Sequence, residues 1–234
     1  MTISPQKRQK QLAKKKAKRK QVSIKKTSGR VINVPASFNI GDIPIYESRI
    51  SKSISEFGMG TVILSRKIAP GYVSVSFFMI DSFCLGVKNA SFANLTSERY
   101  HQIIAEINQR ESFVNAPPQC VRKLVEGAAN YAKELGFRPH PDYQEAQKIF
   151  ANIETESCSQ VFEFGREGKP CYVAGPFDKA VEIKRIIEKL RRKCGPGGFK
   201  VFLPMPVEQP PAESETSTQE TPLVGEFSSV PATP

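Results

Sequence analysis

The chain has 234 residues, a formal net charge of +11 and five cysteines. None of its apolar runs approaches the ~20 residues that a membrane-spanning helix needs, and an odd number of widely spaced cysteines argues against a disulfide-dense scaffold. The basic start leads into more basic residues and not into an apolar segment, which excludes a secretory signal. We therefore expect a cytoplasmic protein that has no membrane partner.

Charge is concentrated at the two ends of the chain. Residues 1–30 contain twelve Lys or Arg and no acidic residue, whereas residues 205–234 contain five Glu and no basic residue. The residues between them hold the other 22 basic and 18 acidic side chains, so their net charge is only +4. Both end segments have too few apolar side chains to offset the entropy of ordering the chain. We predict a disordered basic arm over 1–30, one globular domain over 31–203 and a disordered acidic tail, rich in Pro, Glu, Ser and Thr, over 204–234.

The first half of the domain has the pattern of a hairpin followed by helices. Two apolar runs over 59–80 flank Pro70 and Gly71, a pair that suits the central positions of a type II turn, and so predict an antiparallel hairpin. Apolar residues spaced by three and four, together with helix-start and helix-stop residues, then predict three helices, over 97–110, 118–135 and 141–150.

The second half has the pattern of another hairpin and a last helix. Residues 160–174 predict a hairpin with Gly165 and Gly168 in its loop, and residues 178–193 predict a helix that ends before a Gly-Pro-Gly-Gly run. One more strand is possible at 199–203. Strands and helices do not alternate as a parallel doubly wound sheet requires. We therefore expect an α+β fold with two β-hairpins and about four helices in a single compact domain.

The basic arm favours contact with nucleic acid. Lys and Arg side chains that neutralise phosphates release condensed counterions, and a flexible arm can follow a phosphate backbone without reading its sequence. Lys outnumbers Arg by nine to three in this segment, which favours point-charge contacts over bidentate base recognition. A run of this kind can also serve as a solubilising tail or as a targeting signal. The predicted nucleic-acid-binding residues are Lys7, Arg8, Lys10, Lys14, Lys15, Lys16, Lys18, Arg19, Lys20, Lys25, Lys26 and Arg30.

A second hypothesis is a small enzyme whose pocket gathers polar residues from several loops. The loop expected after the apolar strand offers a base, a thiol and a cation, and a Pro-flanked His lies in a rigid corner between two helices. Each of these residues could equally have a structural role: a thiol between Phe83 and Leu85 suits an inert core, and the corner suits a polar plug. The candidate pocket residues are Asp81, Cys84, Lys88, His140, Asp142 and Lys169.

The spacing of potential ligands predicts neither a metal site nor a cofactor. No two cysteines form a CxxC pair, the two histidines are far apart, and the glycine-containing turns match neither a P-loop nor a dinucleotide-binding fingerprint.

Three runs of the domain resemble an uncharacterised group of bacterial hypothetical proteins. They are FFMIDSFCLGVKNA, KLVEGAANYAKELGFRPHPDY and FGREGKPCYVAGPFD, and together they extend over roughly half of the domain. The resemblance implies an established domain in a bacterial cytoplasm, which makes a nuclear-targeting role of the arm less favoured, and it implies no activity or ligand.

The sequence therefore favours a binding protein that contacts nucleic acid, more specifically RNA or a ribonucleoprotein, through its basic arm. The enzyme described above is the alternative from another class. A non-catalytic adaptor is the third possibility, in which the acidic tail binds a partner or folds back on the arm and competes with polyanions.

Overall fold

A five-stranded antiparallel sheet forms the centre of the described part of the chain, residues 39–175 and 178–203 of the computed structural model. Its strand order is β4-β3-β2-β1-β5, and β4 and β5 are its edges. The strands are β1 (Ile45–Ser51), β2 (Met59–Ala69), β3 (Tyr72–Asp81), β4 (Gly86–Thr96) and β5 (Phe113–Asn115). The predicted basic arm and acidic tail lie outside the described residues.

The hairpin predicted over 59–80 is confirmed. Strands β2 and β3 pair along their length, with Val62 opposite Phe78 and Leu64 opposite Ser76. The turn between them places Gly71 at a φ of +82°, a left-handed conformation that glycine adopts without steric cost at the third position of a type II turn. Strand β4 extends this hairpin into a meander, so the loop expected after the apolar strand is a tight turn that leads into another strand of the same sheet.

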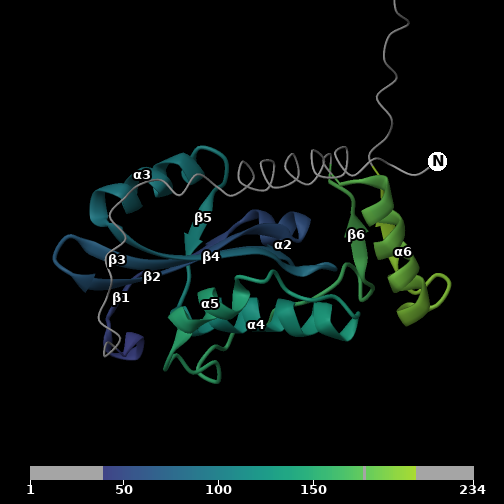
Figure 1. Ribbon diagram of the computed structural model, residues 1–234. Helices are drawn as coiled ribbons and strands as arrows, with labels where there is room; N and C mark the ends of the chain where they lie inside the picture. Colours follow the sequence, from purple (N-terminus) through teal and green to yellow (C-terminus); the bar gives the residue numbers. More distant parts are fainter. Residues whose placement is uncertain (1–38, 176–177, 204–234) are drawn as a thin grey trace, which may run out of the picture. The chain divides into compact units, whose positions relative to one another are not determined.

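Helices cover both faces of the sheet (Figure 1). Helix α3 (Ser97–Asn108) packs on one face, where Tyr100 and Ile104 contact Ile63, Val73 and Val75. The opposite face is covered by α4 (Pro118–Glu134), α5 (Tyr143–Ala146) and the 3-10 helix η2 (Gln147–Phe150), and it contains the larger hydrophobic core. Two short elements, η1 (Ile40–Asp42) and α2 (Ser53–Phe57), flank β1.

The three helices predicted in the first half are present with small changes at their ends. Helix α3 begins after Thr96, whose hydroxyl oxygen accepts a hydrogen bond from the backbone N–H of Arg99. Helix α4 ends before Gly136, which has a φ of +86°. The predicted third helix begins at Tyr143 and continues as the 3-10 helix η2.

The last part of the domain is a small parallel β–α–β unit. Strand β6 (Cys171–Val173) is followed by α6 (Ala180–Cys194) and by β7 (Lys200–Phe202), and β6 pairs with β7 in parallel. The helix predicted over 178–193 and the strand predicted at 199–203 are therefore confirmed.

The hairpin predicted over 160–174 is wrong. Between Arg166 and Lys169 a single antiparallel bridge forms around a turn, and no strand precedes it within the described residues of this segment. The backbone of the segment pairs elsewhere, because the N–H groups of Gly165 and Cys171 donate to the carbonyls of Ser82 and Phe83. The two short apolar runs on either side of this turn therefore do not pair with each other. The first run contacts the turn after β3, and the second contacts that turn and pairs with the more distant β7.

A disulfide joins Cys120, in the first turn of α4, to Cys158 in the long segment after η2. Both cysteines are buried, and the other three, Cys84, Cys171 and Cys194, are free thiols. The odd number of cysteines excluded a disulfide-dense scaffold but did not predict this bond. Among the described residues, no helix is long and apolar enough to cross a membrane.

Candidate functional site

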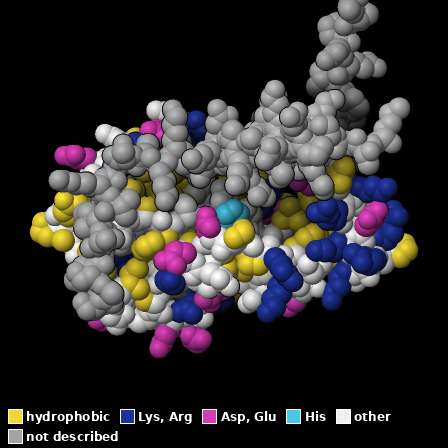
Figure 2. All heavy atoms as spheres, in the orientation of Figure 1, with side chains coloured by type: hydrophobic (Ala, Val, Ile, Leu, Met, Phe, Trp, Pro, Cys, Tyr) yellow, Lys and Arg dark blue, Asp and Glu magenta, His cyan; other side chains and the backbone are white. Residues whose placement is uncertain are grey.

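Helix α6 is strongly amphipathic, with a basic outer face. Ile183, Ile186 and Leu190 form the stripe that packs against the body, where Leu190 joins a cluster with Cys84 and Tyr172. At 100° per residue the opposite face carries Lys184, Arg185 and Arg192 around Glu188, all exposed. Figure 2 shows Lys and Arg side chains gathered at the right of the view, over the part of the surface where α6 lies in Figure 1.

The positive charges on the basic face of α6 are not neutralised by ion pairs with carboxylates of the described residues. Within residues 39–175 and 178–203, none of its exposed basic side chains forms an ion pair, although Glu188 lies among them. A cation without a carboxylate partner keeps its full capacity for an external anion. The exposed basic residues of the helix are Lys184, Arg185, Arg191, Arg192 and Lys193.

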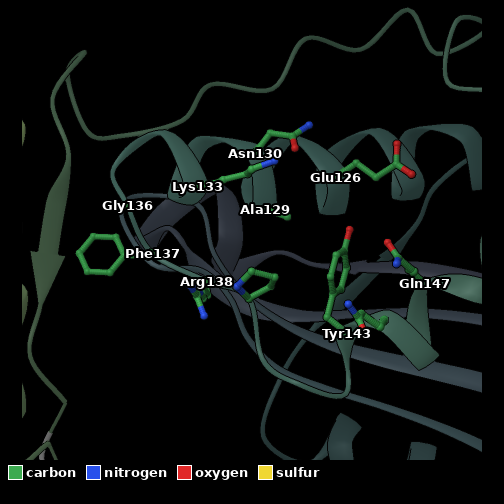
Figure 3. A pocket seen from close by; sticks show the side chains of 11 residues that line it. Glu126, Ala129, Asn130, Lys133, Gly136, Phe137, Arg138, Tyr143 and Gln147 are labelled. Atoms are coloured by element: carbon green, nitrogen blue, oxygen red, sulfur yellow. The ribbon is translucent and has the colours of Figure 1, made fainter.

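A groove of about 630 Å³ lies between α4 and the segment that runs from Gly136 into η2 (Figure 3). Its apolar floor includes Ala129 and the ring of Tyr143, both 8% exposed. The hydroxyl of Tyr143 points toward α4, and burial raises the pKa of this phenol to about 12. The groove is lined by Glu126, Ala129, Asn130, Lys133, Gly136, Phe137, Arg138, Pro139, Tyr143, Gln144 and Gln147.

The groove adjoins α6. Lys189 of α6 donates a hydrogen bond to the carbonyl of Gly136 at 2.8 Å, and its ammonium lies 4.9 Å from the centre of the Phe137 ring. Gly136 and Phe137 both line the groove, so one lysine connects the groove with the basic helix.

Three of the six predicted pocket residues lie around the turn between β3 and β4. Asp81 is 3% exposed, and its carboxylate accepts hydrogen bonds from the backbone N–H groups of Phe83 and Cys84. Burial raises the pKa of Asp81, and the charge of Lys88 partly opposes that rise. Cys84 is fully buried, and burial raises the pKa of its thiol strongly, so it is not activated as a thiolate.

The other three predicted pocket residues form contacts of their own. His140 lies 4.0 Å from Asp142, measured between Nδ1 and Oδ2, and its Nδ1 also accepts the backbone N–H of Asp142. Lys169 donates to the carbonyl of Gly197, in the loop after α6. The backbone of His140 donates to Val87, so these segments are neighbours, but none of the six predicted pocket residues lines the groove between α4 and the 136–147 segment.

A polar cluster that the sequence did not lead us to expect lies under α3. The Tyr100 hydroxyl donates a short hydrogen bond to Glu47, and Arg49 donates to the other oxygen of that carboxylate at 2.9 Å. Tyr46 and His101 extend the cluster to the surface, with 3.3 Å between the Tyr46 hydroxyl and Nε2 of His101. The hydrogen bond from Tyr100 of α3 to Glu47 of β1 therefore joins the helix to the strand, and Arg49 holds the Glu47 carboxylate in place. Glu47 and Arg49 are two residues apart, which places them on the same face of a strand, and this spacing was the available signal.

The groove also contains residues that sequence reasoning overlooked. In the corner from Gly136 to Tyr143 the predicted pocket residue is His140, whereas Arg138 and Tyr143 line the groove and the Phe137 ring packs with the cluster that contains Leu190. The twelve predicted nucleic-acid-binding residues of the arm lie outside the described residues. Over the described ranges, no group of three or more His, Cys, Asp or Glu side chains is placed to hold a metal ion.

Comparison of the chain with protein-family models, with curated proteins and with solved structures gave no match.

Proposed function

We propose that this protein binds nucleic acid, more specifically RNA or a ribonucleoprotein, through its basic arm and the basic face of α6. The observation that carries the proposal is the separation of charge along the chain. Twelve basic and no acidic residues occupy positions 1–30, whereas the residues from 31 to 204 have a net charge of only +4.

The basic face of α6 supports this proposal from within the folded domain. Among the described residues its exposed cations form no ion pair, and Leu190 and its neighbours fix the position of the helix, so these charges are held at one place on the domain. Cations held close together on one helix can contact neighbouring phosphates of a nucleic-acid strand. A purely solubilising arm would not require a second basic surface on the domain.

The two basic elements have different roles in the proposal. The arm is rich in Lys, which suits contacts with phosphates without sequence preference. The face of α6 is rich in Arg, whose planar guanidinium forms bidentate contacts with phosphate and stacks on bases. We therefore propose that the arm supplies affinity and that the helix orients the strand on the domain.

Crosslinking followed by sequencing of the recovered nucleic acid tests this proposal. We expect the full chain to recover defined RNA, and we expect a chain that begins at Val31 to recover much less. A thermal melt of both chains controls for folding. Recovery of no nucleic acid above background by the full chain would contradict the proposal.

We also propose that binding takes place in the cytoplasm. The Cys120–Cys158 disulfide makes this setting testable, because disulfides are rare in the reducing cytosol of most organisms. Alkylation of thiols during cell lysis should show whether this pair is oxidised in the cell. An oxidised pair in nearly all molecules would favour an oxidising compartment over the cytoplasm.

A further inference from the structure

We propose that the groove between α4 and the 136–147 segment holds one unstacked nucleotide of a single-stranded RNA whose phosphates run along α6. This inference rests on the proposed function and adds to it the site that receives a base. It is argued from the size of the groove, its polar side chains, its charge and its connection to α6.

The groove has the size and the floor that a base requires. Its volume of about 630 Å³ falls within the range of about 300–1,000 Å³ that is usual for small-molecule sites. The ring of Tyr143 and the side chain of Pro139 line the groove and provide flat or apolar surface against which a base can pack.

The polar side chains of the groove match the edge of a base. Asn130, Gln144 and Gln147 each carry an amide, which offers a donor and an acceptor side by side, as the edges of bases do. Within the described part of the chain, none of these three amides forms a hydrogen bond through its side chain. The donors and acceptors of these three amides are therefore free to form hydrogen bonds with a base in the groove.

The charge of the groove fits a phosphate. Lys133 and Arg138 are exposed at its rim and have no carboxylate partner among the described residues, whereas Glu126 is already paired with Arg122 at 2.8 Å. The unpaired charge of the groove is therefore positive, which attracts the phosphate attached to a base in the groove.

The connection with α6 distinguishes a nucleotide within a strand from a free nucleotide. Lys189 contacts the groove at Gly136 and Phe137. Arg185 and Arg192 each lie about one helical turn from Lys189 along α6. A strand that places one base in the groove can therefore continue with its next phosphates along the helix. A duplex cannot do so unless it gives up the stacking of that base, so the geometry favours a single strand.

Fluorescence anisotropy with the full chain and a labelled 12-nucleotide RNA tests the inference. The RNA is compared with its duplex form and with single-stranded DNA of the same sequence. We expect Asn130→Ala combined with Gln144→Ala to weaken binding of single-stranded RNA by about tenfold and to leave binding of the duplex unchanged. The matched control removes two exposed amides on the other face of the sheet, Asn108→Ala with Gln109→Ala, and should change neither.

A charge variant and a crosslink give independent results. Lys133→Gln with Arg138→Gln should reduce the steepness of log Kd against log salt by about 1, whereas the amide variant should leave it unchanged. Photocrosslinking with 4-thiouridine in the RNA should label the peptides that contain Phe137 and Tyr143.

The outcomes separate failure of the groove from failure of the proposed function. If the full chain binds RNA but the amide variant binds single strands and duplex as the wild type does, the groove is not the site and nucleic-acid binding stands. Crosslinks confined to the arm would overturn the groove in the same way. If the wild-type chain binds neither form of RNA nor the DNA, the proposed function fails and the groove fails with it.

Discussion

Arg66 is a buried charged residue whose desolvation is offset by hydrogen bonds to backbone carbonyls. Arg66 on β2 is 2% exposed and has no carboxylate partner among the described residues. Its guanidinium donates to the carbonyls of Ile149 at 2.8 Å and Ile43 at 2.6 Å, and it also reaches Gly41 and Phe150. Burial lowers the pKa of Arg66, and the four carbonyls that it joins lie in or next to η1 and η2, so this side chain holds both against the sheet.

Replacing Arg66 with Met should destabilise the domain by about 3 kcal/mol, because several buried carbonyls would lose their charged donor at once. Urea unfolding gives the free energy directly. Arg110→Met, at an exposed position on the other face of the sheet, is the matched control and should change stability little. Equal midpoints for the Arg66 and Arg110 variants would refute this role.

Asp81 should make stability depend on pH. Burial raises the pKa of Asp81 in the folded protein, so the folded state holds this proton more tightly than the unfolded state does. The resulting stabilisation is present below the ordinary carboxyl pKa and is lost as the pH rises through the higher folded pKa. Asp81→Asn keeps an oxygen that can accept from Phe83 and Cys84 but does not ionise.

We therefore expect the Asn variant to become progressively more stable than the wild type as the pH rises from the acidic to the neutral range. Urea midpoints measured across that range check the trend, with Asp42→Asn, at an exposed site, as the control. A constant difference between wild type and the Asp81 variant at every pH would rule out this coupling.

At the scale of elements, what could be predicted from sequence depended on how local the determining signal was. The hairpin of β2 and β3 and helix α4 were predicted, because a Pro-Gly turn and a three-four spacing lie within the segments themselves. The pairing of β6 with β7 was not predicted, because α6 separates the two strands and neither strand sequence indicates which strand it pairs with. Strand β4 was missed because an edge strand with exposed polar residues lacks a continuous apolar run.

The same reason explains why the sequence indicates the basic arm, which stays a prediction, and does not indicate the groove. The basic arm is a contiguous run and is visible by counting. The groove combines Asn130 and Lys133 of α4 with Arg138 and Tyr143, and only the packing of α4 and α5 on one sheet face brings them together. The basic face of α6 lies within one segment, so the helical spacing of its Lys and Arg residues is a signal that the sequence alone contains.

The Cys120–Cys158 disulfide is the element-scale feature with the clearest energetic consequence. It closes a separation of 38 residues that includes most of α4, α5 and η2, and therefore the groove. Loss of a cross-link over that length should cost about 3–4 kcal/mol through the entropy of the unfolded chain. Urea unfolding with and without reductant measures this cost.

Cys120→Ser with Cys158→Ser should remove the effect of reductant, whereas Cys194→Ser should preserve it, because Cys194 is a free thiol. Identical unfolding of the wild type in oxidising and reducing buffer would show that the disulfide does not constrain the unfolded chain.

At the scale of the whole molecule, the central claim is that charge is placed for contact with a polyanion. The first 30 residues carry a charge of +12, while residues 31–204 and 205–234 carry +4 and −5 and nearly cancel, and the folded domain adds a basic helix beside a polar groove (Figure 2). Binding of this kind depends steeply on salt, because each phosphate contact releases a condensed counterion. The salt dependence therefore reports the number of contacts that the arm and α6 make.

The most direct measurement is the salt dependence of single-stranded RNA binding by the full chain and by two variants of it. One variant replaces the twelve basic residues of the arm with Gln, and the other carries Lys184→Gln, Arg191→Gln and Arg192→Gln, with Lys52→Gln, Lys67→Gln and Arg110→Gln as its charge-matched control. We expect a steep dependence for the wild type, near loss of binding for the arm variant and a slope smaller by about 2 for the α6 variant. A wild-type affinity that does not change with salt, or equal slopes for all four chains, would contradict the account.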